Sequence, residues 1–208
     1  MKFKYHRWFQ WLVVPFVALA FHIYFGYRII GRENIPEGGC VVCPNHIQLS
    51  DPPFAAVALS HRTPLRLMAK KELFRIPVFN WMIRALGAYP VNRGGADVGA
   101  IRHTIRMLED GKTVGMFPQG HRNNGVDPRT TKIHAGAAMI ALRAGVPILP
   151  VFIRVPDNRM RAFCRKEVII GKPITPEEMH YDPEAPGEYD RIMRMAFERV
   201  CALGDETP

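Results

Sequence analysis

Serine is scarce in this chain of 208 residues, which contains only Ser50 and Ser60. Neither lies in a Gly-x-Ser-x-Gly sequence, so the strand-to-helix turn that carries the nucleophile of many serine hydrolases is excluded. The chain also lacks the Gly-x-x-x-x-Gly-Lys-Ser/Thr and Gly-x-Gly-x-x-Gly loops that cradle nucleotide phosphates. We therefore expect chemistry that needs neither a covalent serine nor a nucleotide.

Cysteine is also rare, and only Cys40 and Cys43 of the four cysteines lie close together. Their spacing is that of half a zinc or redox site. The segment around them is β-like, however, and residues three apart on a strand point to opposite faces. No second pair completes a site, so two buried strand cysteines are the favoured interpretation. We expect no metal site, and nothing in the sequence requires an oxidising compartment.

Acidic residues are outnumbered, since 28 Lys and Arg against 19 Asp and Glu give a net charge of +9 and a pI near 9.7. Arginine, whose planar fork binds phosphate with two hydrogen bonds, supplies 20 of the 28. The excess indicates an anionic ligand or membrane surface, or a compositional bias of the genome. A nucleic-acid partner is not expected, because the aromatic residues gather near the N-terminus instead of alternating with the basic ones.

One run without formal charge spans residues 8–27, about 30 Å as a helix, which is enough to cross the hydrocarbon core of a bilayer. Gln10, Pro15 and His22 weaken the case for a simple span, and basic residues at both ends give no preferred orientation. We predict that residues 1–30 form a membrane-associating helical segment, either an anchor bent near Pro15 that enters and leaves one face or a transmembrane helix. A cleaved signal peptide and an ordinary buried helix are further alternatives.

Residues 31–208 alternate between short runs rich in Val and Ile and longer segments with helical spacing of apolar residues. This order predicts a single α/β domain with a largely parallel mixed sheet flanked by helices. Ligands of such sheets bind beyond the carboxyl ends of the strands. Strands are predicted at 39–44, 64–69, 87–91, 112–117, 147–153 and 166–170, and helices at 52–60, 71–86, 97–110, 134–144 and 187–203, with a surface connection at 176–187.

The segment after the first predicted strand carries His46 and Asp51. Their spacing is too long for one helix face, but a strand-to-helix turn can fold the carboxylate onto the imidazole and fix its tautomer. The other ring nitrogen can then take a proton from an alcohol. Alternatively, Asp51 and Pro52 are a good helix start, with Asp51 as the N-cap and Pro52 as the first helical residue. The two roles are compatible.

Three further segments lie at the ends of predicted strands. Residues 87–95 close one strand with Arg93 and two glycines, which suits a phosphate cradle. Residues 117–122 close another strand with Arg122, and residues 145–151 open a later one. Each segment alone has a plainer interpretation, because loop arginines are commonly solvated and Gly and Pro mark turns.

Taken in order, the four blocks closely resemble the glycerolipid acyltransferase family typified by lysophosphatidate acyltransferase. The family pattern is Asn-His, four residues and Asp; then Gly-x-x-Phe-x-x-Arg; then Phe-Pro-Glu-Gly-Thr-Arg; then Val-Pro-x-x-Pro. The resemblance covers about residues 30–155 and includes Lys132 and Gly136 ahead of the fourth block. It implies that residues 31–208 are an acyltransferase catalytic domain.

The resemblance also implies the reaction, in which an acyl chain moves from acyl-CoA or acyl carrier protein to the free hydroxyl of 1-acyl-sn-glycerol-3-phosphate, giving phosphatidate. No cofactor is implied besides the acyl thioester, and the implied location is the cytoplasmic face of the cell membrane. His46 is then the general base and Asp51 its partner, with a tetrahedral oxyanion on the way. The other implied roles concern substrate binding. Arg93 is implied to bind the acceptor phosphate, with Arg122 and Lys132 as further candidates, and Gln119 and Gly120 are implied to contact the glycerol part. Residues 146–150 are implied to shape the acyl side, and further substrate contacts are implied for Asn45, Phe117 and Pro118.

The chain departs from the family pattern at several positions. Gln119 replaces the usual Glu, His121 replaces Thr, and Tyr89 is shifted by one residue from the Phe of the second block. His121 is expected to add polarity toward the substrate, with a second base as the alternative. The departures concern the acceptor more than the chemistry. Another lysophospholipid or an aminolipid acceptor, or a non-catalytic membrane-binding relative, therefore stays an alternative.

A last basic stretch, residues 154–166, has no place in the family pattern. It includes Arg159, Arg161 and Arg165. The sequence is compatible with docking on lipid headgroups and with a solvated loop.

Overall fold

The computed structural model describes residues 7–60, 62–85, 87–92, 97–159, 161 and 163–205. Arg93, predicted to bind the acceptor phosphate, lies outside the described residues. Its role stays a prediction from the sequence.

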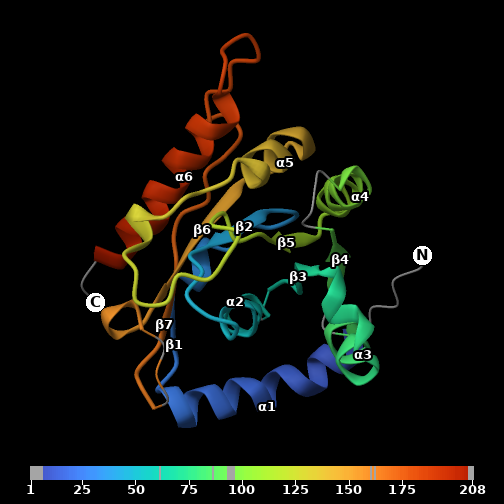
Figure 1. The fold of residues 1–208 in the computed structure, drawn as a ribbon, viewed down its shortest axis with the longest axis vertical. Helices are drawn as coiled ribbons and strands as arrows, with labels where there is room; N and C mark the ends of the chain where they lie inside the picture. Colours follow the sequence, from blue (N-terminus) through green and yellow to red (C-terminus); the bar gives the residue numbers. More distant parts are fainter. Residues whose placement is uncertain are drawn as a thin grey trace.

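A seven-stranded sheet with the order β1-β7-β6-β2-β5-β3-β4 forms the centre of the molecule (Figure 1). Every neighbouring pair is parallel except β6 and β7, which are antiparallel. All four residues of β2 are buried, as expected for a strand of a parallel sheet that is covered on both faces. The strands are β1 (Arg28–Ile30), β2 (Val41–Pro44), β3 (Leu65–Lys70), β4 (Ala88–Val91), β5 (Thr113–Gly115), β6 (Ile148–Arg154) and β7 (Glu167–Ile170).

Helices cover both faces of the sheet (Figure 1). On one face, α4, α5 and α6 contribute Met107, Ile140 and Phe197 to one hydrophobic cluster, and on the other face α2 contributes Phe54 and Ala58 to a second cluster that α1 borders. The predicted α/β fold with a largely parallel mixed sheet is confirmed. The helices are α1 (Arg7–Phe25), α2 (Asp51–Leu59), α3 (Pro77–Ala85), α4 (Val98–Glu109), α5 (Gly136–Ala144) and α6 (Glu188–Asp205), with short 3-10 helices η1 (Arg32–Asn34), η2 (Lys71–Arg75), η3 (Pro128–Thr130) and η4 (Pro156–Asn158).

The two close cysteines illustrate how the central strand is covered. Cys43 belongs to the cluster beneath α5 and α6, and Cys40 belongs to the cluster beneath α2. Both are fully buried free thiols. The prediction that they point to opposite faces of a strand is confirmed.

The structure differs from the predicted elements in two places. The helix predicted over 71–86 is divided into η2 and α3, with Ile76 in an extended conformation between them. Pro77 explains the break, because a proline disfavours helical geometry in the residue before it. The edge strand β1 was not predicted, since three residues carry too little pattern to stand out without their partner β7.

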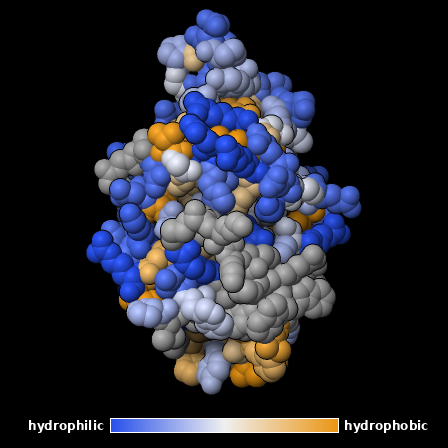
Figure 2. Space-filling view, turned by 90° about the vertical axis from the view of Figure 1, so that its right-hand side faces the viewer, coloured by the Kyte–Doolittle hydropathy of each residue, from blue (hydrophilic) through white to orange (hydrophobic). Residues whose placement is uncertain are grey.

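The helix α1 presents two apolar faces. Its inner side chains pack against the cluster of α2, whereas its outer side chains lie at four-three-four spacing and are exposed. Figure 2 shows apolar side chains gathered at the lower end of the molecule, where α1 lies. Within the described residues, no helix combines the length and hydropathy needed to cross a bilayer. The inner residues are Val14, Val17, Ala18, Phe21 and Phe25, and the outer ones are Leu12, Phe16, Leu19 and Ile23.

Candidate active site

Asn45 fixes the first turn beyond the carboxyl end of β2. Its side chain is buried, its amide nitrogen donates to the carbonyl of Ile153 at 3.2 Å, and its oxygen accepts the Ile153 N–H at 2.7 Å. Ile153 belongs to the neighbouring strand β6, so this pair of bonds sets where the chain leaves the sheet. Asn45 thereby places the next residue, His46. Its predicted contact with substrate stays a prediction.

Asp51 begins α2 and folds back toward His46. Its Oδ2 accepts hydrogen bonds from His46 Nδ1 at 2.7 Å, from the Ile47 N–H at 2.6 Å and from the Gln48 N–H at 2.7 Å. The carboxylate is fully buried, and Oδ1 has no hydrogen-bond partner among the described residues. The N-terminus of α2 stabilises this buried negative charge. The contact expected between the two side chains is therefore present. The alternative of Asp51 as the N-cap is wrong: Ser50 is the N-cap and Asp51 the first helical residue, because the Asp51 carboxylate accepts from the N–H groups of the preceding turn and not from those of the helix.

The ring of His46 is held by this carboxylate on one edge and by an aromatic ring on its face. The Phe117 ring stacks on it with centroids 4.2 Å apart and planes at 30°. The His46 side chain remains 12% exposed, whereas Asp51 is 0% exposed. With Nδ1–H donated to Asp51, Nε2 carries the lone pair of the neutral imidazole. The arrangement can thus accept a proton at Nε2 from a ligand that reaches the ring.

Gln119 ties the loop after β5 to His46. Its Oε1 accepts the backbone N–H of His46 at 2.6 Å, and its amide donates to Thr131 Oγ1 at 2.7 Å. The His46 carbonyl in turn accepts the N–H of Asn123 at 2.9 Å. Both main-chain polar groups of His46 are therefore held by one loop, residues 117–123. Gln119 is 1% exposed, and its predicted contact with the glycerol part stays a prediction.

Gly120 occupies the tightest point of the same loop. Its φ is +71°, in the left-handed region, and a Cβ atom there would lie 3.1 Å from the His134 ring. Its N–H donates to the carbonyl of Phe117 at 3.0 Å, which closes the turn around the buried Pro118. Glycine is required here because other residues rarely adopt this conformation.

Two exposed cations, Arg122 within the loop and Lys132 after it, are the predicted phosphate-binding candidates that the structure describes. Arg122 precedes Asn123, which binds the His46 carbonyl, and Lys132 follows Thr131, which binds Gln119. Each of the two predicted phosphate-binding residues is therefore next in the chain to a residue that helps to hold the His46 turn. Residues 146–150, predicted to shape the acyl side, lead into β6 beside β2, with Ile148 paired with Val41 and Pro150 with Cys43 in parallel register. Their role on the acyl side stays a prediction.

Lys166 is a buried cation that no pattern in the sequence marks. It is 1% exposed, its Nζ lies 3.1 Å from the centre of the Phe25 ring, and it donates to the Arg161 carbonyl at 3.1 Å. Burial lowers the pKa of Lys166, while the nearby Cys164 thiol and Asp51 carboxylate act in the opposite direction. The Lys166 ammonium lies between α1 and the start of α2, where Asp51 stands. Because three segments far apart in the sequence create this position, the sequence analysis does not identify Lys166.

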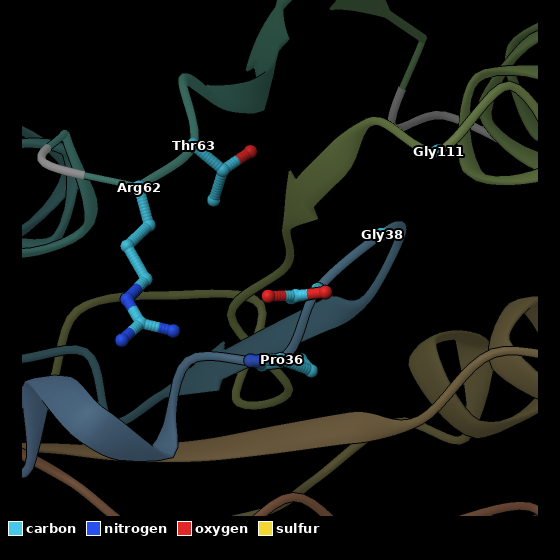
Figure 3. A pocket seen from close by; sticks show the side chains of 6 residues that line it. Pro36, Gly38, Arg62, Thr63 and Gly111 are labelled. Atoms are coloured by element: carbon cyan, nitrogen blue, oxygen red, sulfur yellow. The ribbon is translucent and has the colours of Figure 1, made fainter.

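A separate hollow of about 440 Å³ lies at the amino ends of the strands, at the opposite end of the sheet from His46. Figure 3 shows Arg62 and Thr63 beside Pro36, Gly38 and Gly111 there. These residues precede β2, β3 and β5 in the chain, whereas His46 follows the carboxyl end of β2. Because the chemistry expected of this fold lies beyond carboxyl ends, this hollow is not the candidate site.

Comparisons with known proteins agree with one another. The family model named Acyltransferase matches residues 26–154. The 1-acyl-sn-glycerol-3-phosphate acyltransferase of Borreliella burgdorferi is 34% identical over 138 residues, which are 64% of this chain and 54% of that protein. The protein of the same name from Bacillus subtilis is 28% identical over 152 residues, 72% of this chain and 74% of that one. The chain spans about half the length of the curated relatives from B. burgdorferi and Streptococcus pneumoniae.

A solved structure extends the similarity to nearly the whole chain. The 1-acyl-sn-glycerophosphate (LPA) acyltransferase from Thermotoga maritima matches with a TM-score of 0.67 and 27% sequence identity. The match covers 94% of this chain and 80% of the other. The likeness therefore includes the sheet and the helices that position His46.

Proposed function

Because the chain belongs to the Acyltransferase family, we propose that it transfers an acyl chain from an acyl thioester to the free hydroxyl of 1-acyl-sn-glycerol-3-phosphate, giving phosphatidate. One observation carries the proposal: Asp51 Oδ2 lies 2.7 Å from Nδ1 of His46, whose side chain stays 12% exposed beside a fully buried carboxylate. The similar proteins are 1-acyl-sn-glycerol-3-phosphate acyltransferases, and this similarity suggests the acceptor.

In the proposed mechanism His46 is the general base. Its Nε2 takes the hydroxyl proton of the acceptor while the oxygen attacks the thioester carbonyl. This attack forms the new C–O bond, and the resulting tetrahedral oxyanion collapses by re-forming the carbonyl and breaking the C–S bond. The imidazolium returns the proton to the departing thiolate. Asp51 stabilises the imidazolium in between, and its own charge is held by two backbone N–H groups.

We assign phosphate binding to three candidate cations. Arg122 is exposed within the loop that clamps His46, Lys132 is exposed after it, and Arg93 is the candidate given by the sequence. A guanidinium fork binds a phosphate with two parallel hydrogen bonds. An anionic acceptor whose hydroxyl meets Nε2 would therefore be oriented by charge on the same side.

Membrane association is part of the same proposal. The acceptor is a lipid, and α1 exposes an outer stripe with Phe16 69% and Ile23 68% exposed, while its inner face packs on the catalytic body. Lying in the interface, such a helix buries apolar area among acyl chains without crossing the bilayer. We place the enzyme at the cytoplasmic face of the cell membrane, with acyl-CoA or acyl carrier protein as the donor.

The decisive experiment measures transfer by purified protein. Lysophosphatidate and acyl-CoA or acyl carrier protein are supplied in detergent micelles, and phosphatidate is detected by mass spectrometry. A lysophospholipid with a phosphodiester headgroup serves as the comparison acceptor. We expect product with the phosphomonoester acceptor and loss of that product in His46→Ala. Turnover restricted to acceptors without a phosphomonoester would contradict the proposed substrate.

A further inference from the structure

The loop between β6 and β7, residues 155–166, carries an unusually exposed aromatic side chain, and the structure describes it at 155–159, 161 and 163–166. Phe163 is 77% exposed, and its φ of +57° lies in the left-handed region. A non-glycine residue in this region is strained, and such strain persists where the surroundings impose it. An apolar ring held outward under strain points to a function at the surface.

The loop is attached to the end of α1. The backbone N–H of Lys166 donates to the carbonyl of Phe25 at 3.1 Å, and the Lys166 ammonium lies over the Phe25 ring. The ring of Phe163 lies 5.9 Å from that of Tyr24, which is itself 55% exposed. In Figure 1 the loop reaches the same end of the molecule as α1. Loop and helix thus share one surface.

The exposed ring extends the outer stripe of α1. Leu12, Phe16, Leu19 and Ile23 follow one side of the helix, and the exposed Tyr24, next to Ile23 in the chain and about 100° further round the helix, lies beside Phe163. The apolar surface therefore continues from the helix onto a segment about 140 residues later in the sequence. Aromatic residues are favoured in the interfacial layer of a bilayer.

Two exposed cationic side chains stand two residues before and two residues after Phe163 in the chain. The side chains of Arg161 and Arg165 are 59% and 56% exposed. Each has one acidic neighbour: Asp157 lies 3.7 Å from Arg161, and Glu167 lies 3.1 Å from Arg165. Glu167 is also bonded to Arg154 at 3.0 Å and is 7% exposed, so its charge is shared inside the protein. The outward-facing charge of the loop is positive.

We propose that the β6–β7 loop is a second lipid-contact element, in which Phe163 enters the interfacial layer beside Tyr24 while Arg161 and Arg165 bind the phosphates of anionic headgroups. The inference rests on the membrane association proposed above and adds a site and a lipid class to it. An acidic carrier protein would match the arginines, but it gives no reason for an exposed phenylalanine that continues the apolar stripe. The aromatic and cationic side chains together favour a lipid surface.

Vesicle sedimentation tests the proposal with the full chain. Vesicles of phosphatidylcholine alone and of an equal mixture with phosphatidylglycerol are compared for the wild type, Phe163→Ala and R161Q/R165Q. The control R102Q/R106Q removes the same charge from exposed positions on α4, on the opposite face of the sheet from α1. We expect R161Q/R165Q to lose about 25-fold in affinity for the anionic vesicles, about fivefold per arginine, with little change on neutral ones. Phe163→Ala should weaken binding to both.

A tryptophan at position 163 reports insertion into the lipid layer, which a change of charge alone does not produce. In F163W, fluorescence should be quenched more by lipids brominated in the acyl chain than in the wild type, whose three tryptophans give the baseline. Equal quenching, or equal loss of binding in R161Q/R165Q and R102Q/R106Q, would overturn the inference. If R161Q/R165Q raised the KM for acyl carrier protein and left vesicle binding unchanged, the result would overturn the inference in favour of a protein partner.

The micellar assay separates this inference from the proposed function. All loop variants should retain wild-type turnover of lysophosphatidate in detergent micelles, because none of the substituted residues belongs to the proposed catalytic pair or to the proposed phosphate-binding cations. Absence of turnover in the wild type would contradict the proposed function. Unchanged vesicle binding in both loop variants, with normal turnover, would contradict only the lipid-contact element.

Discussion

Gln119 Oε1 lies 2.6 Å from the backbone nitrogen of His46, and these two residues are 73 positions apart in the sequence. The same side chain donates to Thr131 Oγ1 at 2.7 Å, so Gln119 links the His46 turn to the segment that carries Lys132. The residue that departs from the family pattern therefore holds the main chain of the proposed base. A glutamine serves both bonds, since it has an acceptor and a donor.

Replacing Gln119 should affect both stability and turnover. Gln119→Ala leaves the His46 N–H without its partner in a buried place, which costs about 1–3 kcal/mol. We expect the free energy of unfolding in urea to fall by that amount and kcat to fall with it. Thr131→Val, which keeps the Gln119–His46 bond, is the matched control and should reduce kcat less. Equal losses of kcat in the two variants would show that the His46 contact has no special weight.

The dyad itself gives the largest predicted effect on rate. His46→Ala should lower kcat by about 10²–10⁴-fold with little change in Tm, because the ring is a partly exposed general base. Asp51→Asn should lower kcat too, and should also lower Tm, because it removes a buried charge at the start of α2. His121→Ala is the control for loss of a nearby imidazole. A loss in His121→Ala as large as in His46→Ala would make His121 the stronger candidate for the base.

The cations are predicted to act on the acceptor alone. Arg93→Ala should raise the KM for lysophosphatidate far more than the KM for the thioester, and Arg122→Gln and Lys132→Gln should do so to a smaller degree. Steady-state kinetics with each substrate varied in turn checks this. Lys172→Gln, at an exposed position beyond β7, is the control. Equal changes in both KM values would argue against phosphate binding.

Lys166 should leave a mark on the pH dependence of stability. Burial lowers its pKa below the ordinary 10.5, so at alkaline pH the unfolded chain still binds a proton that the folded chain has released. The wild type should therefore gain free energy of unfolding as pH rises through this window. Lys166→Met should lack that gain, whereas the exposed control Lys172→Met should retain it. Urea unfolding across the alkaline range decides, and parallel curves for wild type and Lys166→Met would contradict the prediction.

The body of the fold was readable from local patterns. Strands β2 and β6 are runs of buried apolar residues, and α6 shows apolar side chains at helical spacing, so both kinds of element were predicted close to their observed bounds. The failures have local causes as well. Pro77 interrupts the helix predicted over 71–86, and β1 is a three-residue edge strand whose identity comes from its pairing with β7.

The site was predicted less completely than the fold. The contact between His46 and Asp51 follows from a short turn, where few conformations are available to five residues. The roles of Asn45 and Gln119 in clamping that turn could not be predicted, because their partners Ile153 and Thr131 come from other loops and strands. Residues 146–150 were grouped with the site by motif order. Parallel pairing places Pro150 beside Cys43, three residues before His46, and the role of this segment on the acyl side stays a prediction.

The order of amino acids by itself determined which segments become strands and helices and where the reactive imidazole stands along the chain, since hydrophobic period and turn chemistry act over a few residues. Only the tertiary structure decided that Gln119 binds the backbone N–H of His46, that the Lys166 ammonium lies over the ring of Phe25, and that the β6–β7 loop shares a surface with α1. These contacts join residues far apart in sequence, and they exist because close packing of the two layers on the sheet brings those particular groups together.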